Sequence, residues 1–271
     1  MTRRRFDPFR PFRLARALVV HSFSEYAAYR MEMVFWVVGG TLPLFMMFLW
    51  IELAGQRATG SFSAADFAAY FLLVFLVRHM TPFVPVPELE RAIRHGELSA
   101  QLLRPLDPYW PMTAAQLMDI AHRLPITIPV VIVGMIWSGA WQIIAFEDWP
   151  LFLLALLGAI LLHYNLLYCA GLAAFWMERV RGFEGLMWNG YFVLGGGLAP
   201  IALFPDVVQQ IVVWSPFRYM MSFPIEIAIG RVAPADTWFG FALLTFWLAF
   251  SIGLMRLLWH RGLRRYAAYG S

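Results

Sequence analysis

Residues 151–177 read LFLLALLGAILLHYNLLYCAGLAAFWM and contain no charged side chain. About 20 apolar residues in an α-helix cross the ~30 Å hydrocarbon core of a bilayer. This segment exceeds that length, so as a helix it can tilt or extend past the bilayer. We therefore predict a transmembrane helix here, and the segments on either side continue the same pattern.

Composition points the same way. The 271 residues are 61% hydrophobic and 14% charged, whereas soluble domains have about 45–50% and about 25%. Apolar segments recur along the whole chain, and no polar block between them is large enough to fold separately. We predict one all-α integral membrane domain over residues 1–271.

Six spans are expected in all. The other five cover residues 33–51, 64–83, 124–141, 186 to the Gly195–Gly197 run, and 237–259. Residues 6–30 mix aromatic and apolar side chains with arginines, which favours an amphipathic helix lying along the inner membrane face. Within 198–235, four prolines interrupt two apolar pieces, which predicts short re-entrant helices on the outer side, between the fifth and sixth spans.

The basic residues set the orientation and the expected surroundings. All 21 are arginines, which bind phosphate well, and phospholipid is the expected partner. Nucleic acid is not, because the arginines are scattered between apolar segments. Only Arg57, Arg218 and Arg231 fall in segments placed outside, so both termini are predicted to be cytoplasmic.

The loop at 85–108 holds most of the polar residues of the first half of the chain. Leu89, Ile93 and Leu98 recur among charged residues, which predicts a short amphipathic cytoplasmic helix broken at Gly96. Such a helix can dock in a groove and transmit a push to both neighbouring spans. We expect Ile93 and Leu98 to anchor it there.

Catalytic and metal motifs are missing from the sequence. A Walker A loop needs a lysine and the chain has none, so we predict that it is neither an ATPase nor another enzyme. The six histidines never form a helical pair beside a carboxylate, and Cys169 is the only cysteine. No metal site and no cofactor bound by this chain are expected.

A few polar residues inside or beside the spans are candidates for a transport pathway or gate: Arg78, His79, Asn165, Gly196 and Glu226. For each, a structural interpretation competes. Arg78 can snorkel to lipid phosphates, the His163-Tyr164-Asn165 cluster can bond helices together, and Glu226 can pair with Arg218 or Arg231. The glycine run at 195–197 permits either a bend or close packing.

Four stretches together resemble the membrane subunit of bacterial type-2 ABC exporters, in the six-span branch with a separate ATPase. They are Tyr29-Arg30 at the end of the interfacial helix, ERAIRHGEL (90–98) running into LLRPL (102–106), PFRY (216–219) with Pro224, and LWHRGLRRY (258–266). Where this branch typically has a glutamate after the final Arg-Tyr, this chain has Ala267 and Ala268.

The resemblance implies a permease of the bacterial inner membrane that dimerises with a second copy or a related permease. It would bind two ABC ATPase subunits, which would hold the ATP and Mg²⁺, and open a path as ATP is hydrolysed. The ATPase-coupling residues it implies are Glu88, Glu90, Arg91, Ile93, Arg94, Gly96, Glu97, Leu98, Arg104 and Pro105.

Two other functions compete with this one. An ion-coupled secondary transporter or channel would show an internal repeat and acids in mid-span, and neither is evident. An intramembrane enzyme would use the group Asp119, His122 and Arg123, but Asp119 and Arg123 are more simply an i,i+4 ion pair. The apolar, aromatic-rich spans favour an amphipathic or lipid-like cargo.

Overall fold

The computed structural model describes residues 40–56, 62–82, 85–177 and 180–269, and these ranges contain helices and no strand. The predicted interfacial helix at 6–30 lies outside the described residues. The longer helices are α3 (Leu42–Gln56), α4 (Ala64–Met80), α7 (Tyr109–Ser138), α8 (Trp149–Leu172), α9 (Arg181–Val193) and α13 (Pro234–Tyr269). Shorter ones are α5 (Pro85–Arg94), α6 (Glu97–Leu102), α10 (Asp206–Trp214), α11 (Pro216–Met220) and α12 (Ser222–Ala228), with single 3₁₀ turns η1 (Ala140–Ile143), η2 (Phe146–Asp148), η3 (Ala173–Phe175) and η4 (Ile201–Leu203).

Four helical segments of the described residues are long and apolar enough to cross a membrane: Ala64–Arg94, Tyr109–Ser138, Phe146–Phe175 and Pro234–Tyr266. They overlap the predicted second, third, fourth and sixth spans, with different bounds. Of the first predicted span only residues from 40 on are described, and α3 in this part is a shorter apolar helix. The prediction of an all-helical membrane fold is confirmed. The prediction of six spans is not confirmed.

The fifth predicted span differs most from expectation. Helix α9 has 13 residues, which at 1.5 Å per residue is about 20 Å and too short to cross the hydrocarbon core alone. It begins at Arg181 rather than near Leu186 and ends at Val193, before the glycine run. Gly196 has φ +90°, a conformation that does not continue a right-handed helix.

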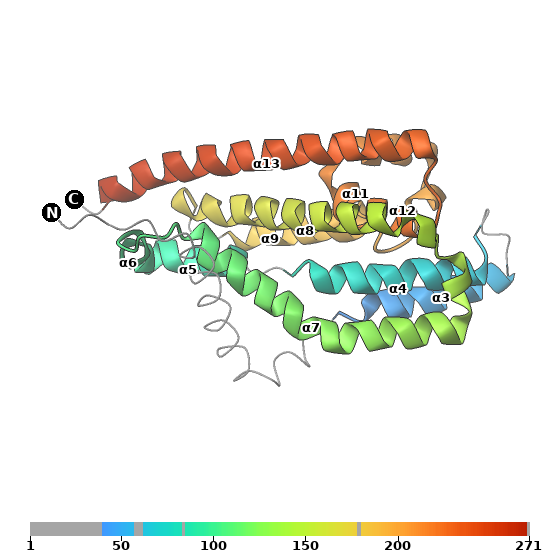
Figure 1. The fold of residues 1–271 in the computed structure, drawn as a ribbon. Helices are drawn as coiled ribbons and strands as arrows, with labels where there is room; N and C mark the ends of the chain where they lie inside the picture. The colour runs from blue at the N-terminus through green and yellow to red at the C-terminus, as the bar shows by residue number, and fades with distance from the viewer. Residues whose placement is uncertain (1–39, 57–61, 83–84, 178–179, 270–271) are drawn as a thin grey trace, which may run out of the picture.

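The helices pack in two groups that run roughly along one axis (Figure 1). Helix α4 packs against both α3 and α7, and α8 packs against α13. Helices α11 and α12 lie on α8 at one end of the bundle, and α5 lies on α8 towards the other. The C-terminal end of α13 lies at the α5–α6 end (Figure 1). Segments from 85–102 and 206–228 therefore occupy opposite ends of the molecule.

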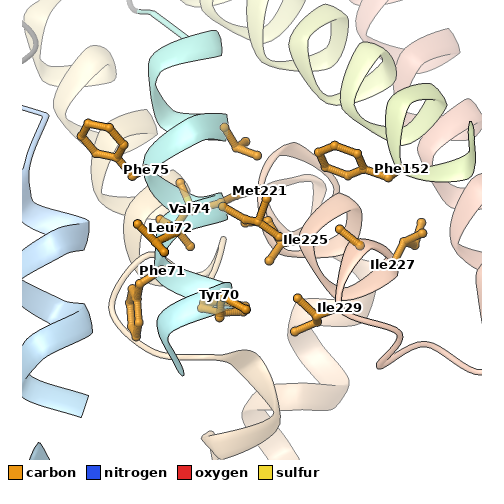
Figure 2. Close-up of a cluster of buried hydrophobic side chains, with 14 of the residues drawn as sticks. Tyr70, Phe71, Leu72, Val74, Phe75, Phe152, Met221, Ile225, Ile227 and Ile229 are labelled. Atoms are coloured by element: carbon orange, nitrogen blue, oxygen red, sulfur yellow. The ribbon is translucent and has the colours of Figure 1, made fainter. Parts of the chain in front are cut away.

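The core forms around α4, the most buried span. Tyr70, Leu72 and Val74 of α4 belong to one buried cluster with Ile225 of α12 and Phe152 of α8 (Figure 2), and all five are at most 1% exposed. A capping box starts the helix: the Ser63 hydroxyl accepts the Asp66 N–H at 3.2 Å, and the Asp66 carboxylate accepts the Ser63 N–H at 2.8 Å. The two bonds satisfy backbone donors that a helix start leaves open.

Helix α7 is longer than the third predicted span, because the helix already begins at Tyr109 and continues into the span without a break. It bends partway along its length (Figure 1). Pro125 and Pro129 lie inside it, and each lacks the N–H that an uninterrupted helix would use. The hydroxyl of Thr127, which lies between the two prolines, donates to the Arg123 carbonyl oxygen at 2.9 Å.

Large apolar side chains cover the outside of the bundle. On α7, Ile136 and Trp137 are 67% and 80% exposed, and only 22% of the apolar window of that helix is buried. On α13 only 11% of the apolar window is buried, and Trp238 and Phe246 are among its exposed side chains. Apolar faces of this extent are covered by lipid or by another protein.

Candidate functional site

The segment predicted to couple to a partner forms two helices, α5 and α6, joined at Gly96. The break at Gly96 is confirmed: this residue has φ +78°, where a side chain would be strained. Pro85 and Pro87 occupy the first turn of α5, where a missing N–H costs no helix bond. The two short helices thus form the connection between α4 and α7, and the chain changes direction between them at Gly96.

The apolar side of this pair faces inward. Leu89 and Leu98 are fully buried and Ile93 is 7% exposed, in a cluster with Tyr168 and Phe175. A Cβ at Gly171 of α8 would lie 2.8 Å from Leu89 Cδ1, so the helices are in close contact there. The expectation that Ile93 and Leu98 face a partner is therefore corrected: they fix α5 and α6 onto α8, because burial in the chain's own core removes them from the surface.

The opposite side of the pair is charged and exposed. Arg91 lies 3.5 Å from Glu97 across the Gly96 turn, and Arg94 lies 3.6 Å from Glu90 within α5. Side chains of Arg91, Arg94 and Glu97 are 45–63% exposed, whereas Glu90 is 18% exposed. Exposed pairs of this kind contribute little stability. Their charges remain available to a partner.

Sequence reasoning overlooked the most exposed apolar residues of this segment. Leu103 is 89% exposed and Leu102 is 41% exposed at the end of α6, next to the exposed Arg104 and Pro105. Leu103 does not fit the 3.6-residue apolar pattern of Leu89, Ile93 and Leu98. This departure from the pattern could have indicated that its side chain is exposed. We call the exposed residues Arg91, Arg94, Glu97, Leu102, Leu103, Arg104 and Pro105 the α5–α6 face.

The C-terminal part of α13 is attached to this segment. The hydroxyls of Ser99 and Tyr266 are 2.8 Å apart, and the Tyr266 ring packs edge-on to Phe175 with centroids 6.1 Å apart. A Cβ at Gly262 would overlap the Phe175 ring, so α13 can approach η3 this closely only with glycine there. The α5–α6 pair, η3 and the end of α13 therefore form one packed unit.

Arg78 and His79 lie at the end of α4, in contact with protein. The Arg78 guanidinium carbon is 3.8 Å from the ring centroid of Trp188 in α9, a cation–π contact. His79 is 1% exposed, and its Nδ1 lies 2.8 Å from the Phe75 carbonyl oxygen. If Arg78 reached lipid phosphates, its guanidinium would point outward. Instead the Arg78 guanidinium packs on the Trp188 ring.

The polar cluster in α8 bonds three helices together, as its structural interpretation predicted. The Tyr109 hydroxyl of α7 donates to Asn165 Oδ1 at 3.0 Å, and Asn165 Nδ2 donates to the Ser251 hydroxyl of α13 at 3.4 Å. The Thr113 hydroxyl lies 3.2 Å from that of Tyr164. These bonds hold α7, α8 and α13 together in the C-terminal half of α8.

At the other end of the molecule, Glu226 pairs with Arg218 at 2.7 Å, and Arg231 pairs with Asp66 at the same distance. The sequence allowed either arginine as partner of Glu226, and the structure selects Arg218. Burial alone would lower the pKa of Arg218, but the Glu226 carboxylate raises it above its ordinary value. Elsewhere, within α7, the predicted ion pair of Asp119 and Arg123 is also present, with a distance of 2.7 Å.

Gly196 serves both purposes that the sequence left open. Its positive φ turns the chain after α9, and its carbonyl accepts a bond from the buried Tyr70 hydroxyl at 2.9 Å. A Cβ at Gly196 would overlap that hydroxyl oxygen. Among the described residues no group of three or more His, Cys, Asp or Glu is placed to hold a metal ion.

A family model described as "ABC-2 family transporter protein" matches residues 21–270. The chain belongs to this family. The resemblance drawn from the four sequence stretches is thereby confirmed, and the chain is a type-2 ABC permease subunit. No curated protein and no solved structure matches it in the corresponding comparisons.

Family membership fixes the general role of this permease subunit. It is a membrane component of an ABC transporter, and such components work with an ABC ATPase in general. The match covers the α5–α6 face and the C-terminal end of α13 within one continuous range. The apolar outside of the bundle agrees with a multi-pass protein of the membrane.

Proposed function

We propose that this chain is the transmembrane subunit of an ATP-driven exporter, which acts as a dimer and couples to separate ATPase subunits through the α5–α6 face. The observation that carries the proposal is the division of α5 and α6 into two sides. Leu89, Ile93 and Leu98 fix the pair to the bundle, while charged side chains and Leu103 are exposed. A rigidly attached, exposed helix pair is suited to transmit a push.

The way the pair is attached supports coupling. Helix α5 follows α4 after a short connection and packs on α8, and α6 is bonded to the end of α13 by Ser99 and Tyr266. A displacement of α6 therefore acts on three spans at once. The dense packing of such interiors transmits a displacement instead of absorbing it.

The charge distribution supports a cytoplasmic location for the α5–α6 end. In the described residues this end carries arginines on α5, after α6 and on the last turns of α13 (Arg91, Arg94, Arg104, Arg261, Arg264 and Arg265). The opposite end carries Arg218 and Arg231, both paired with carboxylates. Cytoplasmic ends of membrane proteins are enriched in arginine. Both termini are then cytoplasmic, and α10 to α12 lie at the outer side as re-entrant pieces.

The cargo we propose is an amphipathic or lipid-like molecule. The exposed sides of α7 and α13 are apolar, and either could face a second permease across a path. The Arg78, His79 and Asn165 side chains are engaged with neighbouring helices, which favours structural roles for them over cargo binding. Gly196 and Glu226 stay candidates for gating at the outer end.

The proposal is tested by purifying the tagged chain in mild detergent, identifying bound proteins by mass spectrometry and assaying ATP hydrolysis. We expect an ABC ATPase to copurify with the parent. The double substitution Arg91→Glu with Glu97→Arg keeps the internal pair but reverses the surface charges, and with Leu103→Asp it should release the ATPase. Val207→Asp is the matched control, because Val207 is 69% exposed at the opposite end.

Two results would overturn the proposal. The first is a purified protein that transports cargo in vesicles with no nucleotide-binding partner, which would favour a secondary transporter. The second is an ATPase that is retained by the α5–α6 variant but lost in Val207→Asp, which would move the coupling surface to the other end.

A further inference from the structure

Two cavities lie side by side at the α10–α12 end of the molecule. The wider one has a volume of about 670 Å³ and is lined by Asp66, Ile143 and residues 229–234. The narrower one has a volume of about 310 Å³, and its lining includes Phe62, Tyr70, Gln209 and Glu226. Ile229 and Arg231 belong to the lining of both cavities, so these two residues form the wall between them.

Arg231 is held in this wall from two sides. Its Nη2 donates to Asp66 Oδ1 at 2.7 Å, on the side of the wider cavity. Its guanidinium carbon lies 3.9 Å from the ring centroid of Phe62, on the side of the narrower cavity. Both contacts come from the beginning of α4 or just before it, whereas Arg231 comes from the segment before α13. The wall is therefore a side-chain contact between two separate elements.

Together the two cavities have apolar and charged walls without an excess of either charge. Phe62, Val213 and Ile229 supply apolar surface. Arg218 and Glu226 line the narrower cavity as an ion pair, and Arg231 in the wall pairs with Asp66, which lines only the wider cavity. A volume of about 310 Å³ is at the lower end of the range for small-molecule sites.

We propose that the two cavities are halves of one binding site for the polar head group of an amphiphile, and that the head group displaces Arg231 to pass between them. The proposal rests on the function proposed above, since it names the chemical class of the cargo at the outer end. The preferred head group has no net charge and is zwitterionic. A zwitterion can exchange partners with both members of an ion pair, whereas a net anion would gain an arginine but meet the adjacent carboxylate.

The wall is tested by the reactivity of a cysteine introduced at Ile229, which is 5% exposed. In a Cys169→Ala background, Ile229→Cys should react slowly with a charged maleimide. Arg231→Gln should speed this reaction about tenfold or more, since a charge-assisted bond of this kind contributes roughly 1.5–3 kcal/mol. Ala202→Cys is the positive control, because this exposed residue also lines the narrower cavity but should react equally with and without Arg231→Gln.

A second control separates the ion pair from the helix cap. Asp66 also accepts the Ser63 N–H, so a substitution of Asp66 would disturb both interactions. Ser63→Ala removes the capping hydroxyl and leaves the bond from Arg231 to Asp66, and should leave the labelling rate of Ile229→Cys unchanged. Equal rates in the parent and in Arg231→Gln, or a faster rate in Ser63→Ala alone, would overturn the assignment of Arg231 as the wall.

The head group is tested with soluble analogues on the same Ile229→Cys protein. Glycerophosphocholine is a zwitterion and should slow labelling in a saturable manner, while glycerol phosphate, an anion, should not. Protection by glycerol phosphate alone, or by neither compound, would overturn the proposed site. These measurements need no ATPase, so their outcome is independent of the copurification test.

Discussion

Gly196 is a residue where backbone conformation and side-chain packing both favour glycine. Its φ of +90° is accessible to glycine, and the missing side chain leaves room for the Tyr70 hydroxyl that donates to its carbonyl. Tyr70 belongs to the narrower cavity and to the core around α4. The turn after α9 therefore connects backbone geometry with packing at the α10–α12 end.

We expect Gly196→Ala to destabilise the permease by about 1–3 kcal/mol, because a Cβ there is strained and collides with Tyr70. Thermal unfolding of the purified protein in detergent measures the effect. Gly253→Ala is the control: nothing lies within 4 Å of its Cβ position, so it should be neutral or slightly stabilising. Equal unfolding midpoints for both variants would contradict this account of the turn.

The Asp119–Arg123 pair in α7 gives a second prediction for single residues. Both side chains are at most 11% exposed, and loss of one partner from a buried pair typically costs about 3–5 kcal/mol. Asp119→Leu alone should lower the unfolding midpoint markedly. Asp119→Leu combined with Arg123→Leu should recover most of the loss. A double variant as unstable as the sum of the single variants would show that the pair is not the relevant interaction.

The sequence indicated which side chains form ion pairs or polar contacts, but it did not always identify their partners. The spacing of Asp119 and Arg123 identified their pair, since both lie on one helix face. For Glu226 two arginines were near in sequence, and only the turn between α11 and α12 selects Arg218. The contact of Arg78 with Trp188 joins α4 to α9, which lie far apart in the sequence, and no local pattern indicates it.

At the scale of elements, the unit formed by α5, α6, η3 and the end of α13 is held by close packing. Helix α13 has 36 residues, about 54 Å at helical rise, so it exceeds the hydrocarbon thickness and part of it extends beyond. Gly262 permits the contact of this extension with Phe175. The extension thereby reaches α6, where Tyr266 meets Ser99.

Gly262→Ala should separate the end of α13 from η3, because its Cβ would overlap the Phe175 ring. Limited trypsin digestion followed by mass spectrometry should show faster cleavage after Arg264 and Arg265 than in the parent. Gly253→Ala in the same helix should digest like the parent. Unchanged cleavage in Gly262→Ala would mean that this contact does not hold the extension.

Elements were predictable where their signals are local. The apolar windows of four spans and the break at Gly96 follow from the sequence. The sequence could not show that α9 ends before the glycine run or which side of α5 faces inward. An amphipathic helix can place its apolar side on its own bundle or on a partner, and only the tertiary contacts of Leu89 and Leu98 decide between them.

At the scale of the whole molecule, the two ends have different chemistry. One end presents the α5–α6 face with exposed arginines and Leu103, and the other holds two cavities and two ion pairs. Spans with apolar exteriors separate them. This difference between the ends suits a transporter that binds an ATPase on one side of the membrane and cargo on the other. We therefore propose that the α5–α6 end contacts the ATPase.

Site-directed cross-linking tests this claim most directly. In a Cys169→Ala background, Leu103→Cys and Val207→Cys place one reactive group at each end, at residues that are 89% and 69% exposed. A short bifunctional reagent is added to membranes containing the full transporter, and adducts are identified by mass spectrometry. We predict an adduct between the Leu103→Cys variant and an ABC ATPase, and none from the Val207→Cys variant. An ATPase adduct from Val207→Cys and none from Leu103→Cys would contradict the proposed coupling surface.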